Sequence, residues 1–444
     1  MNIMKKYKVL LMAFALGLSV TSCEQFTDGI NVDPNEFTSA PGNLLIGQAE
    51  LVAVVVAGSN NSRYAGMWVD QFTGSDRQYI TADQYGVTAG DFDDVWDDLY
   101  ADGAQQAILA KEEGQKAGDQ LLEGVASIIE AMLIGEAAAI WGDVPYRSAF
   151  DYGNNPDPTY DPQAQVFEDV QALLDDAIAL VGDASVGPVY GAPVFVSNNA
   201  KWGEVAHTLK ARFYLITKQY DMALAEAQMG ISDPSASLLS SHKDASGARN
   251  LYYQFEVEQR GGYLTANGSN LTQLLDGTRA RLLATPGDSD RLAHYFVDRG
   301  SGLYDLNVSA TGYFGVAQSY PIVDWIETKL IEAEAAAMTS GDGLTPLNEV
   351  RDHLAATYGG SFPHSTATGD DLIAHILEEK YCSLPGSTQI WHDTRRTKNL
   401  LGVPIKNSTA TTIPQRFLYP QVEINANDNF PGLVDLFEPT PVNK

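Results

Sequence analysis

The clearest pattern along the chain is a spacing of three and four residues between apolar positions. This spacing predicts amphipathic helices, because side chains three and four residues apart share one face of a helix. The stripes are Leu121, Val125, Ile128, Met132 and Ile140; Val166, Val170, Leu173, Ala177 and Val181; Trp202, Val205, Leu209, Phe213 and Ile216; and Ile322, Ile326, Leu330, Ala333 and Ala337. The chain is therefore predicted to be mainly α-helical.

Local signals at the helix ends support this prediction. Asp161 followed by Pro162 predicts an N-cap with proline at the first helical position. Residues 220–230 (YDMALAEAQMG) begin another helix and resemble the second helix of a tetratricopeptide repeat, with alanines where two helices approach closely. Thr345 and Pro346 open a further helix. Together these helix pairs favour a helical scaffold over a β-sandwich.

Five long stretches rich in Gly, Asn, Tyr and Pro separate the predicted helices. They cover residues 58–90, 182–199, 232–265, 298–319 and 386–413. Structureless connections longer than about 12–15 residues are uncommon in compact domains and are usually functional. We therefore expect the helices to form the scaffold and these loops to bind.

The N-terminus predicts export. Three lysines precede an apolar run at residues 9–20 (VLLMAFALGLSV), the layout of a secretory signal that is too short to span a bilayer. Thr21 and Ser22 then lead into Cys23, which resembles the lipobox of bacterial lipoproteins. That resemblance implies a signal peptide at 1–22, lipidation of Cys23 and a single domain at 23–444; a free thiol at Cys23 is the alternative. Cys382, the other cysteine, is expected to be a buried thiol.

Composition excludes some classes of function. Removing residues 1–22 takes away three lysines and no acids, so the net charge changes from −29 to −32. Such an acidic chain argues against nucleic acid, since phosphate binding needs a basic face. With 44% hydrophobic and 19% charged residues, the chain can bury a large core.

Several segments, in order behind the lipobox, resemble one family. They are NVDPNEFTSAP at 31–41, IWGDVPYRSAF at 140–150, WIETKLIEAEAA at 325–336, LNEVRDHL at 347–354, ILEEKYCSLPGSTQIWHDTRRT at 376–397 and PQRFLYPQVEINAN at 414–427. This ordered set is similar to the SusD/RagB family of outer-membrane lipoproteins of Bacteroidetes, in its SusD-like branch. LPGST at 384–388 departs from the acidic–glycine step of many relatives, which weakens the transfer of any loop contact.

The resemblance implies a fold and a function. The fold is mainly α, with tetratricopeptide-like helix pairs forming a right-handed α–α superhelix packed against a loop-rich ligand-binding half. The function is that of a lipid-anchored protein, on the extracellular side of the outer membrane, that captures an oligosaccharide. It delivers this glycan to a SusC-type TonB-dependent transporter and acts as its lid. The alternatives are a surface lipoprotein for peptides or another nutrient, and a surface glycoside hydrolase.

The motif residues themselves favour structural roles. In the WGDVPY segment, Gly142 and Asp143 end a helix and Pro145 forbids its continuation. Trp141 is expected in the core, with ligand contact as the alternative. Asp393 is expected to pair with a nearby arginine and lock a helix end.

The ligand site is predicted from residue chemistry, because sugars stack on aromatic faces and hydrogen-bond to planar polar side chains. The region 63–85 offers such a mixture, a second lies at 252–263 and a third at 304–314. The candidate ligand-binding residues are Trp68, Arg77 and Tyr79 first, then Arg63, Tyr64, Gln71, Tyr253 and Tyr313. Each aromatic has core packing as its alternative role.

Catalysis and cofactors are not expected. Adjacent acids such as Asp93–Asp94 and Glu378–Glu379 lie in helical segments, where solvated faces explain them. No H-E-x-x-H, C-x-x-C, Walker-type or G-x-S-x-G sequence occurs. The spacing of Asn31, Asp33 and Asn35 is similar to that of a calcium loop, but Gly42 stands where the closing glutamate is needed. A structural calcium ion is the one alternative left open.

Overall fold

The computed structural model describes residues 40–151, 153–187, 194–196 and 199–444. The signal peptide, Cys23 and the Asn31, Asp33 and Asn35 spacing lie outside the described residues, so they stay predictions. Gly42–Lys444 form one unit of the fold.

Helices dominate the first part of this unit. Its elements are α3 (Gly42–Gly58), α4 (Asn60–Trp68), β1 (Thr73–Gly74), α5 (Arg77–Asp83), the 3-10 turn η1 (Ala89–Phe92), α6 (Asp93–Asp97), the π-helical η2 (Asp98–Ala104), α7 (Gln105–Ala117), α8 (Gln120–Trp141), α9 (Gln163–Val181), β2 (Phe195–Val196), α10 (Trp202–Ile216) and α11 (Tyr220–Ala227).

Short helices and strands alternate in the second part before long helices return. Its elements are η3 (Pro234–Ala236), β3 (Leu238–Ser240), α12 (Leu251–Tyr253), the π-helical η4 (Gln254–Gln259), β4 (Leu264–Thr265), α13 (Asn270–Leu275), α14 (Asp288–Tyr295), β5 (Phe296–Asp298), β6 (Tyr304–Leu306), β7 (Pro321–Val323), α15 (Trp325–Met338), α16 (Leu344–Tyr358), α17 (Gly369–Ser383), α18 (Thr388–Arg396), α19 (Gln421–Ala426) and η5 (Pro441–Asn443). The predicted mainly helical fold is confirmed.

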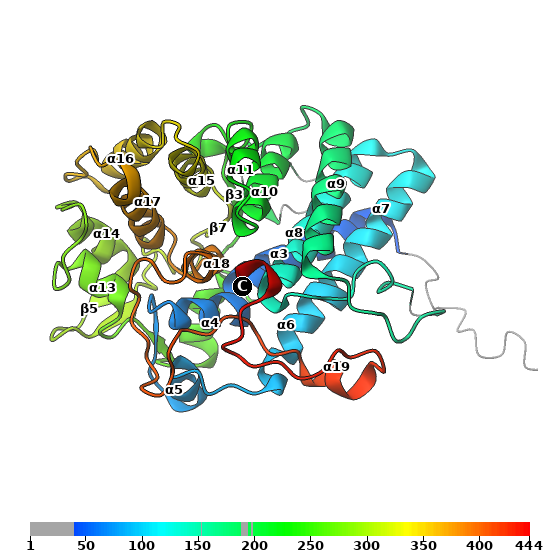
Figure 1. Cartoon of the computed structure of the whole chain (residues 1–444), viewed down its shortest axis with the longest axis horizontal. Helices are drawn as coiled ribbons and strands as arrows, with labels where there is room; N and C mark the ends of the chain where they lie inside the picture. Colours follow the sequence, from blue (N-terminus) through cyan, green and yellow to red (C-terminus); the bar gives the residue numbers. More distant parts are fainter. Residues whose placement is uncertain (1–39, 152, 188–193, 197–198) are drawn as a thin grey trace, which may run out of the picture. The chain divides into compact units, whose positions relative to one another are not determined.

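The long helices pack in a continuous series. Each of α7 to α11 packs on the next, α11 packs on α15, and α15 packs on both α16 and α17. Figure 1 shows this series running from α7 at the right to α16 and α17 at the upper left. The shorter elements α4, α5, α13 and α14 lie below and to the left of it in the same view. The helical array and the loop-rich part of the chain are thus distinct regions of one unit.

Three of the four predicted stripes coincide with helices, namely α8, α9 and α10. The fourth belongs to α15, but Ile322 lies before that helix in strand β7, so the predicted start was wrong. Asp161 is also not the cap of α9, because Pro162 occupies that position. The Asp161 carboxylate instead accepts hydrogen bonds from the backbone N–H groups of Tyr146 and Arg147, at 3.0 and 2.9 Å.

Helix α8 is the centre of the core. Nineteen of its 22 residues are buried, and a helix that is apolar all round belongs in an interior. Its length and hydropathy would also suit a membrane span, as would those of the stretch Gly42–Trp68, but the α8 window is completely buried in the fold. The helix ends at Trp141 because Gly142 adopts a φ of +92°, and the Trp141 indole donates to the Leu418 carbonyl at 2.8 Å. The predicted helix end and core role of Trp141 are confirmed.

Three of the predicted loops contain helices. Residues 58–90 include α4 and α5, residues 232–265 include the short α12, and residues 386–413 include α18. Eight of the nine residues of α4 and all nine of α18 are buried. Both helices are rich in polar residues that are buried with hydrogen-bond or ion-pair partners, such as Arg63 with Tyr79 and Arg396 with Glu334, so their few apolar residues make too short a stripe to predict a helix.

Short antiparallel pairings organise the loop-rich part. Strand β1 pairs with β4, so that Thr73 lies opposite Thr265 and Gly74 opposite Leu264. Strands β2, β3 and β7 form one small sheet, and β5 and β6 form another. The β1–β4 pairing joins segments separated by nearly 200 positions in the sequence.

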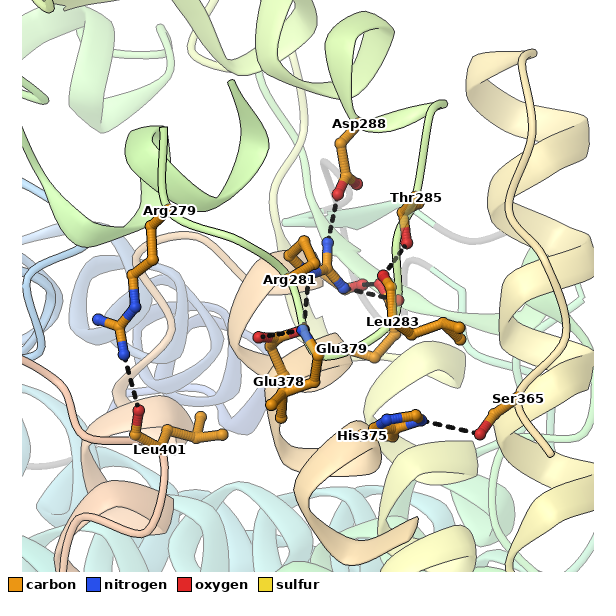
Figure 2. Close-up of polar contacts among 12 residues, drawn as sticks. Arg279, Arg281, Leu283, Thr285, Asp288, Ser365, His375, Glu378, Glu379 and Leu401 are labelled. Carbon is orange, nitrogen blue, oxygen red and sulfur yellow. Dashed lines mark hydrogen bonds and ion pairs between the residues drawn. The ribbon is translucent and has the colours of Figure 1, made fainter. Parts of the chain in front are cut away.

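Buried ion pairs hold the last long helices to this part. Figure 2 shows Arg281 between Asp288 on α14 and Glu378 on α17. Glu379 pairs with Arg281 at 3.2 Å, with Arg291 at 2.7 Å and also with Arg351. Burial alone would raise the pKa of Glu379, but the three arginines hold it well below its ordinary value.

A second buried network joins α15 to α18. Arg396 pairs with Glu334 on α15 and with Asp393 on its own helix, at 2.7 Å to Asp393. The Lys380 ammonium lies 2.9 Å from the other Asp393 oxygen. The prediction that Asp393 pairs with an arginine near the helix end is confirmed. Cys382, between these networks, is a fully buried free thiol as predicted, and burial raises its pKa to about 12.

Replacing Glu379 with alanine should lower the free energy of unfolding by about 3–5 kcal/mol, because three buried arginines lose a shared partner. Urea denaturation followed by circular dichroism measures this. Asp352→Ala is the matched control, since its pair with His364 is exposed and such pairs contribute about 0–1 kcal/mol. Equal losses in the two variants would contradict a central role for Glu379.

Candidate functional site

The structure brings together the first two predicted ligand-binding segments. The β1–β4 pairing places residues 73–74 beside residues 264–265, and the Ser75 N–H donates to the Tyr263 carbonyl at 2.8 Å. As a result the Tyr79 ring lies 6.0 Å from the Tyr263 ring and 5.1 Å from the Phe255 ring. Arg77, Arg260 and Tyr263, with Arg63, Tyr79 and Phe255 beneath them, are called the arginine–tyrosine surface below.

The lower layer of this surface is buried and fully engaged. Arg63 donates to the Tyr79 hydroxyl at 2.9 Å, to the Asn60 side-chain oxygen at 2.9 Å and to the Gly58 carbonyl at 3.1 Å. Its guanidinium also lies 4.2 Å from the centre of the Phe255 ring. Burial of Tyr79 raises its pKa, and Arg63 opposes that rise. Arg63 and Tyr79, both predicted as ligand contacts, therefore support the layer above.

The upper layer carries the exposed groups. The guanidinium carbons of Arg77 and Arg260 lie 6.0 Å and 5.8 Å from the centre of the same Tyr263 ring. The Arg77 side chain is 74% exposed, and its nearest carboxylate, Asp76, is a loose exposed neighbour at 3.8 Å. Arg260 is exposed and has no ion-pair partner among residues 40–444 that the structure describes. Both arginines can thus bind a molecule from solution.

One carboxylate fastens the turn that carries Arg260 and Tyr263. Glu256 accepts hydrogen bonds from the N–H groups of Gly262 and Leu264, at 2.9 and 3.0 Å. Gly262 has a φ of +78°, a conformation that glycine adopts at no steric cost. Burial raises the pKa of Glu256 to about 7, against the smaller opposing effect of these hydrogen bonds. Asp305 raises it further and Arg63 lowers it.

Trp68, Tyr64 and Gln71 lie in the core and not on this surface. Trp68 has no exposed area, its indole donates to the Ala82 carbonyl at 3.0 Å, and its ring lies 5.5 Å from the Trp391 ring. Gln71 is equally buried and exchanges hydrogen bonds with the Tyr381 carbonyl and the Gly386 N–H, at 2.8 and 2.9 Å. Stacking on a sugar needs an open ring face, and Trp68 offers none in this structure.

The other two predicted residues are half-buried. Tyr253 ends α12, directly before the segment that carries Phe255 and Arg260. Tyr313 lines an internal cavity of about 60 Å³ together with Glu136 and Arg212. A cavity of that volume holds a few water molecules and is too small for a sugar ring. The start of the third predicted segment lies beside this surface, because the Tyr304 carbonyl accepts a hydrogen bond from the Ala266 N–H at 2.9 Å, whereas Tyr313 lines the separate cavity.

A wider groove of about 430 Å³ lies between α13 and α14. Its lining is Leu274, Leu275, Asp276, Gly277, Ala280, Arg281, Ala284, Thr285, Pro286, Asp288 and Ser289, with no aromatic ring among them. The two charged groups at its base, Arg281 and Asp288, pair with each other (Figure 2). This groove lacks the stacking platform that a glycan needs.

Sequence reasoning missed the supporting residues Asn60, Phe255 and Glu256. Asn60 accepts a hydrogen bond from Arg63, Phe255 lies under the Arg63 guanidinium, and Glu256 accepts from two backbone N–H groups. Local composition did not reveal these contacts. The Gly261–Gly262 pair in a polar stretch was the one local signal of a tight turn. Within the described ranges, no group of three or more His, Cys, Asp or Glu side chains could hold a metal ion.

Comparison with known proteins identifies similar chains. A family model described as "Starch-binding associating with outer membrane" matches residues 34–256. A SusD homologue from Bacteroides fragilis has a similar structure, with a TM-score of 0.69 and 18% identity over 91% of this chain and 100% of that one. No curated protein matches the sequence.

Two further solved structures share the fold at low identity. A chitin-binding SusD homologue from Flavobacterium johnsoniae has a TM-score of 0.67 and 15% identity over 91% of this chain and 97% of that one. An outer membrane protein from Bacteroides vulgatus, described as involved in nutrient binding, has a TM-score of 0.67 and 15% identity over 91% and 100% of the two chains.

Replacing Trp68 with alanine should cost about 3–5 kcal/mol of stability, because it removes a large, fully buried side chain. Urea denaturation measures the change, and Val257→Ala, at a half-exposed position, is the control. An unchanged unfolding free energy, combined with weaker ligand binding, would show that Trp68 contacts ligand instead.

Replacing Glu256 with glutamine should flatten the dependence of stability on pH. Its raised pKa means that the fold favours the protonated carboxyl, so this contribution is complete below 4.5 and is lost as the pH rises through about 7. Glutamine stays neutral, so the stability of the variant relative to the wild type should increase from pH 5 to pH 8. Denaturation at both values measures this.

Glu258→Gln is the control for this experiment, because Glu258 is exposed and pairs with Arg249 on the surface. A difference between Glu256→Gln and wild type that is the same at both pH values would refute the assignment.

Proposed function

This chain belongs to the SusD/RagB family, and from that premise we propose that it is a lipid-anchored surface protein that captures a glycan for a SusC-type TonB-dependent transporter. The family consists of outer-membrane nutrient-binding proteins, not enzymes. Its family model carries a starch-binding description, and one structural relative is described as chitin-binding. These descriptions support a glycan as the nutrient of this chain.

The sequence supports the finer parts of the proposal. The cationic and apolar segments before Cys23 have the layout of a lipoprotein signal, and two or more acyl chains anchor a protein stably. The strong negative charge of the chain opposes adsorption to anionic lipid, so the acyl chains would supply the membrane attachment. A right-handed superhelix of tetratricopeptide-like pairs, with the loop-rich half closing over the transporter, fits the series of packed helices α7 to α17.

One observation carries the choice of binding site: two segments far apart in sequence converge to present Arg77 and Arg260 around the ring of Tyr263. The planar donors of these two exposed guanidinium groups match the hydroxyl groups of a sugar, and the buried ring of Tyr263 positions them. The buried layer of Arg63, Tyr79 and Phe255 holds this arrangement in place. Pre-organised side chains lose less conformational freedom when a ligand binds.

Hydrolysis has no support in the arrangement of the adjacent acids. Glu378 and Glu379 are paired with Arg281, Arg291 and Arg351, so they do not face each other across an open cleft. A glycosidase needs two carboxyl groups about 5–10 Å apart on either side of a sugar. Binding of a peptide or another nutrient is the alternative proposal.

The chain beginning after Cys23 should be retarded in native gels that contain at least one polysaccharide of a broad panel, and should release no reducing sugar from any. Tyr253→Ala should weaken that retardation, because Tyr253 adjoins the proposed site, while Lys116→Ala, at the exposed end of α7, should not. If no polysaccharide retards the protein and peptides do, the alternative proposal of a peptide-binding lipoprotein is favoured. Reducing-sugar release that survives further purification would overturn the binding role.

The full chain expressed with its signal should co-purify with an outer-membrane β-barrel and should carry acyl chains on Cys23, as detected by mass spectrometry. Cys23→Ser should abolish acylation and remove the protein from the outer-membrane fraction, since it removes the anchoring thiol. An acyl-free N-terminus at Cys23 in the membrane fraction would contradict this part of the proposal.

A further inference from the structure

We propose that the arginine–tyrosine surface selects an anionic saccharide, one that carries carboxylate or sulfate groups, over a neutral one. This inference rests on the proposed glycan-binding function and specifies the class of glycan. The reason is the positive charge of Arg77 and Arg260, since hydrogen bonds to a neutral sugar would not need charged donors.

Acidic side chains outnumber basic ones in this protein. The whole chain has 28 lysines and arginines against 57 acids. Many arginines of the described part form buried ion pairs, such as Arg212 with Glu327 and Arg396 with Glu334. Arg63, Arg77 and Arg260 differ, because none of them makes a close ion pair and all three lie around the rings of Tyr79, Tyr263 and Phe255.

The carboxylates near this surface are held by other groups. Glu258 pairs with Arg249, and Asp305 pairs with Arg299 at 2.9 Å. Asp83 pairs with Lys406 at 2.6 Å. Glu256 is engaged by two backbone N–H groups, which leaves Asp76, exposed and 3.8 Å from Arg77. A loose, solvated pair of this kind contributes little, so the guanidinium of Arg77 stays available to a ligand.

The two exposed guanidinium groups are suitably placed for one ligand. Each lies within 6.0 Å of the centre of the Tyr263 ring, which is only 6% exposed and positions them, so an oligosaccharide bound by one guanidinium group is near the other. Guanidinium groups bind carboxylates and oxyanions through paired N–H donors, and such charge-assisted bonds are about twice as strong as neutral ones. The chain as a whole is strongly acidic and repels an anionic glycan. On this surface, Arg77 and Arg260 supply the positive charge that attracts one.

Matched ligands test the inference by changing the charge of the sugar and not its backbone. Oligogalacturonate and its methyl ester form one pair, which differs in carboxylate charge, and oligosaccharides of κ-carrageenan and their desulfated form make a second, which differs in sulfate charge. Titration calorimetry with the chain beginning after Cys23 should give at least about tenfold tighter binding of the anionic member in one pair. That binding should weaken as salt is raised from low to physiological ionic strength. The pair that responds distinguishes carboxylate from sulfate recognition.

Two variants assign the effect to the proposed residues. Arg77→Gln and Arg260→Gln should each weaken binding of the anionic ligand by about tenfold, and by a larger factor than they weaken binding of its neutral counterpart. Lys116→Gln is the control, since it removes an exposed cation from α7. Circular dichroism should show all three variants to be folded, because the altered side chains are exposed.

The outcomes separate this inference from the proposed function. Binding of a neutral glycan at least as tight as its anionic counterpart, or anionic binding that survives both arginine variants, would overturn the inference and leave glycan capture intact. Failure of every polysaccharide in the broad panel to bind would overturn the proposed function, and this inference with it.

Discussion

Pairing of buried arginines with carboxylates is the interaction on which the rest of this structure depends. Glu379 joins α17 to three arginines from other parts of the chain, and Arg396 joins α18 to Glu334 on α15. Arg212 on α10 pairs with Glu327 on α15 in the same way. A buried charge without its partner is strongly destabilising, so each pair restricts how the helices and the loop-rich part can be arranged.

This pairing also decides where charge remains available. The buried networks use arginine after arginine to neutralise carboxylates inside the fold, and the surface keeps a large acidic excess. The exposed guanidinium groups of Arg77 and Arg260 stand out against that background because the neighbouring acids are engaged elsewhere. Arginine therefore has two roles in this protein: buried arginines neutralise carboxylates inside the fold, and exposed arginines are proposed to bind the ligand.

Prediction of the candidate site from sequence succeeded for residue chemistry and failed for exposure. Arg77, predicted as a ligand contact, is exposed and lies near the Tyr263 ring, and the segments around residues 63–85 and 252–263 do meet; its contact with ligand stays a prediction. Trp68 and Gln71 have the same residue chemistry as a sugar site, yet both are completely buried. Local composition could not distinguish these cases, because burial depends on Trp391, Tyr381 and other residues more than 300 positions away.

The sequence by itself determined the helical scaffold, the end of α8 at the WGDVPY segment and the family to which the chain belongs. The first two features follow from the spacing of apolar residues and from backbone restrictions of glycine and proline, which act over a few neighbouring positions, and the family follows from the resemblance of several ordered segments. Only the tertiary structure decided that α4 and α18 are helices inside the core and that Tyr263 lies beside Arg77. Those outcomes depend on packing and on strand pairing between segments far apart in the sequence. A short stretch of sequence does not determine which distant residues will contact it.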